Sequence, residues 1–139
     1  MRAIEAIVLK AKRFQEHKHI LTLFSKECGI ISVIATARKQ AFSPLLKVEV
    51  ELMPSEKELK KCKAVQIVGS YQALRLSLEK LQRAAMMLDF VEKELPTDEP
   101  VEELYELLEM HLVDMCEAEN SRQVADSFYR QWKLFQGEI

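Results

Sequence analysis

Glycine and proline are scarce in this chain of 139 residues, which contains three glycines and four prolines. So few glycines argue against a loop that cradles phosphate, and neither a P-loop nor a dinucleotide-binding fingerprint is present. The G-x-S-x-G and H-E-x-x-H patterns of hydrolases and metalloproteases are missing as well. We therefore expect a protein that is not an enzyme and that uses no cofactor and no small-molecule substrate.

Cysteine is also rare. Cys28, Cys62 and Cys116 stand far apart in the sequence. An odd, scattered set argues against a disulfide framework and fits a reducing compartment. His17 and His19 could join a cysteine as zinc ligands, but without a second ligand pair the simpler interpretation is an exposed pair in a turn. The sequence thus predicts free thiols and no bound metal.

Long apolar runs are missing too, since none approaches the roughly 18 residues that span a bilayer. At the N-terminus, Glu5 interrupts the stretch that a signal peptide would keep apolar. We expect a cytoplasmic protein with no membrane partner.

What the chain does have is a strong asymmetry of charge beneath a net charge of −2. Residues 1–80 carry 15 Lys/Arg against 8 Asp/Glu, a net of +7, whereas residues 81–139 carry 5 against 14, a net of −9. Such a division predicts two surfaces with different partners, of which only the basic one suits phosphate.

The first 68 residues have the pattern of β-structure. Val48, Val50 and Leu52 alternate with charged residues, as expected of a strand with one buried face. Gly29 stands where a turn would require a positive φ. Five strands are predicted, at residues 4–10, 19–24, 30–36, 47–52 and 63–68. Five short strands in about 70 residues favour a small closed barrel, most commonly an OB-fold.

From Leu74 on, apolar residues recur at helical spacing. The first stripe comprises Leu74, Leu78, Leu81, Ala85, Leu88, Val91 and Leu95. Ser77 is expected to cap this helix and Pro96 to end it. Thr97 or Asp98 is expected to cap a second helix.

The second helix is expected to bury Val101, Leu104, Leu108, Leu112 and Met115, with His111 on its polar flank. A third helix, capped by Asn120 or Ser121, would bury Val124, Phe128, Trp132 and Phe135. The fold class predicted is α+β, with an OB-fold-like barrel in residues 1–72 followed by an acidic helical bundle in residues 73–139.

Basic residues of the barrel lead to a functional hypothesis, because residues 1–47 hold 9 bases and only 3 acids. Barrels that hold single strands combine a positive groove with aromatic side chains on which bases stack. Each lysine alone fits an ordinary solvent-exposed role, and Phe14 and Phe42 fit either a stacking platform or the barrel core. The predicted nucleic-acid-binding residues are Arg2, Lys10, Lys12, Arg13, Phe14, Lys18, Arg38, Lys39 and Lys47.

Several runs of the sequence resemble RecO proteins. The opening strand and turn (EAIVLKA at 5–11, FQE at 14–16), the second strand (LTLFS at 21–25), Gly29 and the third strand (SVIA at 32–35) occur in the order typical of that family. SPLL at 43–46, LRLSLEKL at 74–81, LDFV at 88–91 and LP at 95–96 are similar as well.

The resemblance implies an OB-fold barrel, a helical domain and a role in recombinational repair. Family members bind single- and double-stranded DNA, anneal strands and help to load the recombinase, with RecR and the acidic tail of single-stranded DNA-binding protein as partners. A nucleoid-associated place in the cytoplasm is implied too. By position, Arg38 and Lys39 match the family's basic loop, and Arg13 lies beside the turn residue Glu16.

The sequence departs from the family in places. Many members carry a four-cysteine zinc module after the third bundle helix, whereas this chain ends at residue 139, about where that module would begin. The basic loop is short, and His17-Lys18-His19 replaces a more usual triplet. The chain is expected to be a short form or a fragment without zinc.

Two hypotheses follow. The chain is either a non-catalytic DNA-binding and annealing module, or an interaction adaptor that has kept the fold with little DNA affinity. RNA binding is a third interpretation. One contiguous basic patch on the barrel would favour DNA, and scattered bases would favour the adaptor.

Overall fold

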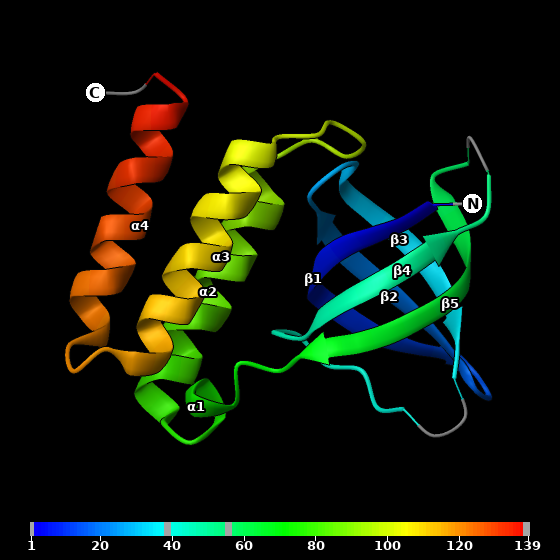
Figure 1. The fold of residues 1–139 in the computed structure, drawn as a ribbon, viewed down its shortest axis with the longest axis horizontal. Helices are drawn as coiled ribbons and strands as arrows, with labels where there is room; N and C mark the ends of the chain where they lie inside the picture. Colours follow the sequence, from blue (N-terminus) through cyan, green and yellow to red (C-terminus); the bar gives the residue numbers. More distant parts are fainter. Residues whose placement is uncertain (1, 38–39, 55–56, 138–139) are drawn as a thin grey trace.

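A closed five-stranded barrel forms the N-terminal part of the computed structural model, which describes residues 2–37, 40–54 and 57–137 (Figure 1). Its strands are β1 (Arg2–Gln15), β2 (Lys18–Ser25), β3 (Gly29–Thr36), β4 (Lys47–Leu52) and β5 (Leu59–Gly69). Around the barrel the order is β1-β2-β3-β5-β4, with every neighbouring pair antiparallel except β3 and β5. The expected OB-fold-like barrel is confirmed.

Alternating side chains fill the barrel interior, as the period of a strand requires. Eleven of them form one buried cluster: Ile4, Ala6, Val8, Leu21, Leu23, Ile31, Val33, Ala35, Leu46, Val48 and Val50. The β4 strand has the predicted bounds, whereas β1 continues to Gln15 and β5 begins at Leu59. Register shifts in β1, between Val8 and Lys10 and between Arg13 and Gln15, accommodate its extra length.

Helices make up the rest of the chain and stack beside the barrel (Figure 1). They are α1 (Gln72–Arg75), α2 (Leu78–Glu94), α3 (Glu102–Glu117) and α4 (Ser121–Phe135). Among the described residues, no helix combines the length and apolar character needed to cross a membrane.

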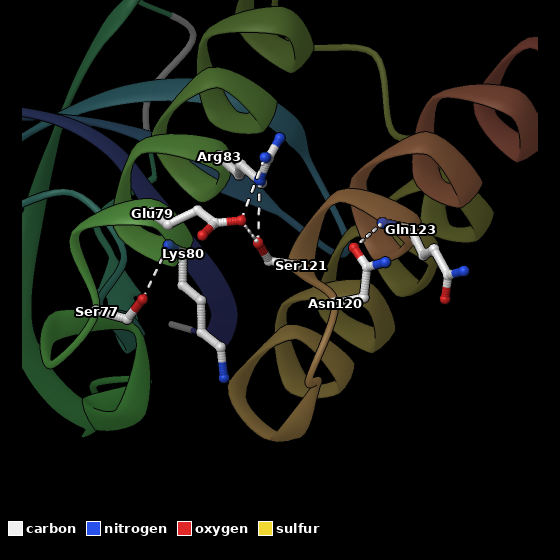
Figure 2. A network of polar contacts seen from close by, with 7 residues as sticks. All are labelled: Ser77, Glu79, Lys80, Arg83, Asn120, Ser121 and Gln123. Atoms are coloured by element: carbon white, nitrogen blue, oxygen red, sulfur yellow. Dashed lines mark hydrogen bonds and ion pairs between the residues drawn. The ribbon is translucent and has the colours of Figure 1, made fainter.

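Two of the three expected caps are confirmed. The Ser77 side chain accepts from the Lys80 N–H at the start of α2, and the Asn120 side chain accepts from the Gln123 N–H at the start of α4 (Figure 2). The cap predicted for the second helix is wrong, because α3 begins after Val101 with no side-chain cap. Thr97 and Asp98 instead lie along β3, as described below.

The predicted buried face of α2 is wrong in part. Leu78 is 71% exposed and Ala85 is also exposed, whereas the helix buries Ala84, Met87, Leu88 and Val91. Leu78 is the first residue of α2, directly after the break that follows α1, and Ala84 rather than its neighbour Ala85 faces the core.

Barrel and helices share a hydrophobic core. Outward-facing barrel residues, namely Ile7, Leu9, Phe24, Ile30 and Leu45, pack in one cluster with the buried faces of all four helices. His111 belongs to this interior, being 2% exposed, so its predicted place on a polar flank is wrong. Its Nδ1 lies 2.8 Å from the Leu107 carbonyl oxygen and its ring contacts Phe128 edge-on.

Candidate nucleic-acid interface

One row of side chains crosses four strands on the outer surface of the barrel. Lys12 of β1 pairs with Ile20 of β2, Ile20 pairs with Ile34 of β3, and Ile34 pairs with Lys61 of β5. The row is outward-facing because Leu21 and Val33, next to two of its members, are buried in the barrel. At roughly 4.8 Å between strands, it spans about 14 Å. We call Lys12, Ile20, Ile34 and Lys61 the basic strip.

The β1–β2 hairpin adds charge and an aromatic ring at one end of the strip. Arg13 and Lys18 are exposed, and Phe14 is 48% exposed. His17 forms the turn with φ 61° and accepts a hydrogen bond from the Ala37 N–H at 2.8 Å. That bond fastens the chain leaving β3 to the hairpin.

Three lysines of the strip and the hairpin are available for contacts with another molecule. Within residues 2–37, 40–54 and 57–137, Lys12, Lys18 and Lys61 form no ion pair with an acid. A lysine of this kind can neutralise a phosphate without first breaking an internal contact.

Lys10 and Lys47, two of the predicted binding residues, form ion pairs with acids of the helices. Lys10 Nζ lies 2.8 Å from Glu92 of α2, and this hydrogen bond and charge raise the pKa of Lys10. Lys47 Nζ lies 2.5 Å from Glu109 of α3 and 3.5 Å from Glu5. Burial opposes the charge of Lys47, but the two acids outweigh it and raise its pKa. Both lysines therefore hold the helices against the barrel.

Two further barrel lysines contact acids of the helical part. Lys26 Nζ lies 3.5 Å from Glu106 and 3.7 Å from Glu102, and Lys60 Nζ lies 3.7 Å from Asp98. The charge asymmetry of the sequence is thus in part complementarity inside the molecule. The charge asymmetry alone had predicted two separate partners. Part of it instead serves the contact between the barrel and the helices.

The sequence left open whether Phe14 and Phe42 belong to the core or offer a stacking surface. In the structure the two rings differ in exposure. Phe42 packs against the barrel cluster, and its ring meets that of His19 edge-on at 5.2 Å. Phe14 stays half exposed beside Arg13. Of the two rings, Phe14 is the one on which a base can stack.

Of the remaining predicted residues, only the backbone of Arg2 is described. Arg2 opens β1 at the end opposite the hairpin, where its backbone pairs with Leu52. Arg38 and Lys39 lie outside the described residues.

Lys61 and Lys63 of β5 are exposed basic residues that the sequence analysis missed. The run EKELKK at 56–61 mixes acids with bases, so the sequence does not mark its lysines as part of an interface. The available signal was the alternation of Lys61, Cys62 and Lys63, which indicates that β5 starts before the predicted residue 63. In the structure Cys62 packs against the barrel core.

Acids are placed on another side of the barrel. Glu49 and Glu51 of β4 pair with Glu5 and Ala3 of β1, so the outer surface of β4 carries negative charge. In the closed barrel β4 borders β1 and β5, so these acids lie outside the row that runs from Lys12 across β2 and β3 to Lys61.

Comparisons with known proteins agree on one family. The family described as "Recombination protein O N terminal" matches residues 1–71. DNA repair protein RecO of Geobacter metallireducens is 30% identical over 122 residues, covering 83% of this chain and 50% of the relative. RecO of Pelotomaculum thermopropionicum is 35% identical over 111 residues, covering 75% of this chain and 43% of the relative.

A third relative, DNA repair protein RecO of a Nostoc species, is 31% identical over 112 residues, covering 76% of this chain and 38% of the relative. The chain thus spans about half, or less, of the length of these relatives. With a family match over more than half of its residues, and with the five-stranded barrel in the matching segment, the chain belongs to the RecO family.

Proposed function

We propose that this chain is a non-catalytic DNA-binding module of DNA repair, which holds single-stranded DNA across the outer surface of β1, β2, β3 and β5. The observation that carries the proposal is the basic strip, in which Lys12 and Lys61 flank Ile20 and Ile34 on adjacent strands. Family membership supports the repair role, because the relatives are named DNA repair proteins.

Each part of this surface matches a part of a single strand. Lys12, Lys18 and Lys61 can contact phosphates, whose neutralisation releases bound counterions. The half-buried Ile20 and Ile34 offer an apolar floor between them, and Phe14 offers a ring for stacking. Binding that depends on phosphate and base faces tolerates many sequences.

Finer roles follow from the family. We propose that the chain binds double-stranded DNA as well, anneals complementary single strands and assists recombinase loading. RecR and the acidic tail of single-stranded DNA-binding protein are the proposed protein partners, in the cytoplasm at the nucleoid. An annealing assay with two complementary oligonucleotides, one labelled, tests the first of these activities directly.

The deciding experiment is fluorescence anisotropy of a labelled single-stranded oligonucleotide over a salt series. We expect affinity to fall log-linearly with salt, and the double variant Lys12→Glu/Lys61→Glu to bind at least about tenfold more weakly with a shallower slope. The matched control is Arg122→Glu/Lys133→Glu, which makes the same change in net charge on exposed positions of α4. Equal loss in both double variants would show non-specific attraction and contradict the strip.

The basic loop provides a second test. Arg38→Glu/Lys39→Glu is expected to weaken binding at moderate salt without unfolding the protein, and unchanged affinity would remove the loop from the interface. No binding by the wild-type chain at low salt would instead favour the adaptor, whose acidic helices would contact a basic partner.

A further inference from the structure

A hollow of about 350 Å³ opens in the outer surface of the barrel, beside the basic strip. Its apolar wall includes Ile20 of β2, Ile30 of β3 and Leu59 of β5. Ile20 is also a member of the strip, so the hollow and the strip are continuous. The volume is at the lower end of the range for small-molecule sites, which suits a single ring system.

The hollow exists because two segments share the edge of β3. The β5 strand pairs with β3 only from Ser32 to Ile34. Nearer the start of β3, the loop between α2 and α3 takes over: Thr97 forms a parallel bridge with Ile30, and the Asp98 N–H donates to the Ile30 carbonyl oxygen at 2.9 Å. Between the end of one partner and the start of the other, the surface stays open.

Polar groups of the hollow are hydrogen-bond acceptors or hydroxyls. Ser32 and Thr97 contribute hydroxyl groups, and Glu58 and Asp98 contribute carboxylates. Among the described residues that line the hollow, none carries a positive charge. Lys60, whose Nζ lies 3.7 Å from Asp98, offsets one of these two negative charges. The carboxylate and hydroxyl oxygens of the hollow favour a ligand edge rich in N–H groups over a phosphate.

We propose that this hollow receives one nucleobase of the bound strand and selects a base with an exocyclic amino group. The apolar wall can cover the face of the ring, while the carboxylates accept hydrogen bonds from the amino group, as Asp and Glu do from the amino group of cytosine. Thymine is disfavoured because it has no exocyclic amino group, and the two carbonyl oxygens beside its N3–H would face the acids. The backbone meanwhile stays on Lys12 and Lys61, a point that rests on the proposed function.

Neutral nucleosides test the hollow without the contribution of phosphate. In methyl NMR spectra of the whole chain, deoxycytidine is expected to shift the Ile30 and Leu59 signals, and thymidine to bind at least about fivefold more weakly. No shift with deoxycytidine, or equal shifts with both nucleosides, would overturn the proposal whether or not oligonucleotides bind.

Two variants identify the groups responsible. Asp98→Asn is expected to reduce the preference for deoxycytidine while keeping the fold, because Asp98 has φ 61° and asparagine tolerates that conformation. Ser32→Phe is expected to fill the hollow and abolish the shifts. The control Glu49→Gln, on the outer surface of β4, should leave the preference unchanged.

An oligonucleotide comparison separates this inference from the proposed function. We expect a cytosine homopolymer to bind more tightly than a thymine homopolymer at the same salt, and Ser32→Phe to equalise them while keeping the salt slope. Failure of both oligomers to bind, with deoxycytidine still shifting Ile30, would refute the DNA-binding function and retain the hollow as a base site. Binding without base preference would refute the hollow alone.

Discussion

At Gly29 the chain turns with φ 73°, directly under the loop between α2 and α3. A Cβ at this position would lie 2.1 Å from the Glu99 carbonyl oxygen, which is backbone and cannot move aside alone. Gly29→Ala is therefore expected to lower the free energy of unfolding by more than about 2 kcal/mol, combining left-handed strain with the clash. Urea denaturation measures the loss.

Gly137 supplies the control for that prediction. Its φ is 78°, yet a Cβ there would meet nothing within 4 Å. Gly137→Ala should therefore lower the free energy of unfolding only by the backbone strain, about 1 kcal/mol. Equal costs for the two variants would show that the contact with Glu99 is unimportant.

Tyr105 makes a partly buried hydrogen bond between α3 and the barrel. Its side chain is 1% exposed, and its hydroxyl donates to Glu5 Oε2 at 2.7 Å. Tyr105→Phe leaves Glu5 Oε2 without this donor, while Lys47 stays 3.5 Å from Oε1, so we expect a loss of about 1.5 kcal/mol in the free energy of unfolding at neutral pH.

The pH dependence of that loss follows from the pKa of Tyr105. Burial, followed by the hydrogen bond to Glu5, raises this pKa above its ordinary value of 10.0. The neutral, donating form is thus favoured in the folded state, and its stabilisation is complete below pH 10 and declines above it. Denaturation of wild type and Tyr105→Phe at pH 8 and pH 11 should show the difference shrinking. A difference that grows with pH would contradict this assignment.

Individual side chains were the hardest feature to predict from sequence. His111 looked polar because the residue type usually is, but its ring fits among Phe128 and other apolar groups once Leu107 satisfies one nitrogen. The lysines divided in the same way: nothing in the sequence distinguishes Lys10, which meets Glu92, from Lys12, which stays free of ion pairs in the described part of the chain. That distinction depends on helix docking.

Among the elements, α2 and α4 are joined by a polar network at their N-terminal ends (Figure 2). Ser121 of α4 donates its hydroxyl hydrogen to Glu79 Oε1 at 2.9 Å, and Arg83 Nε donates to Ser121 Oγ at 3.0 Å. Arg83 also lies 3.3 Å from Glu79, one turn along α2. Three side chains therefore connect two helices between which α3 lies in the sequence.

The Glu79 network gives stability a dependence on acid pH. The hydrogen bond from Ser121, then those from Arg83, hold the pKa of Glu79 below 4.5. Its contribution is therefore present above about pH 4.5 and is lost as the pH falls through the lower folded-state value. We expect Glu79→Gln to be less stable than wild type at pH 7, with the difference closing near pH 3. Thermal melts at several pH values check this, and a constant difference would rule out ionisation as its cause.

Elements with strong periodic patterns were predictable, and their ends were less so. The strand Lys47–Leu52 was located because charge and apolar residues alternate without interruption. The start of α3 was predicted wrongly because Thr97 and Asp98 have the sequence of a helix start. In the structure this segment pairs with Ile30, which is distant in sequence. Long-range pairing outweighs local preference in such cases.

At the scale of the molecule, the barrel and the helices share one apolar cluster. Ile7, Phe24 and Leu45 of the barrel pack with Leu108 and Trp132 of the helices. The division predicted at residues 72 and 73 therefore separates two segments that pack on each other through this cluster, while the barrel interior forms a second cluster of its own. We expect them to unfold together.

Unfolding probes placed in the two parts test this expectation. Trp132, the single tryptophan, reports on α4 by fluorescence. The methyl signals of Val33 and Val50 report on the barrel interior by NMR. Urea midpoints should coincide if the chain unfolds in one step. A lower midpoint for Trp132 would show that the helices leave an intact barrel, and would support independent domains.

The bridge between Ile30 and Thr97 also bears on how the protein behaves in a crowded solution. Without the segment around Thr97, the start of β3 would expose unpaired N–H and C=O groups along a strand rich in isoleucine and valine. Such an edge is a template for strands of neighbouring molecules. The connection between α2 and α3 thus covers the start of β3, which β5 does not reach, and cutting the chain near residue 97 should make the protein self-associate through this edge.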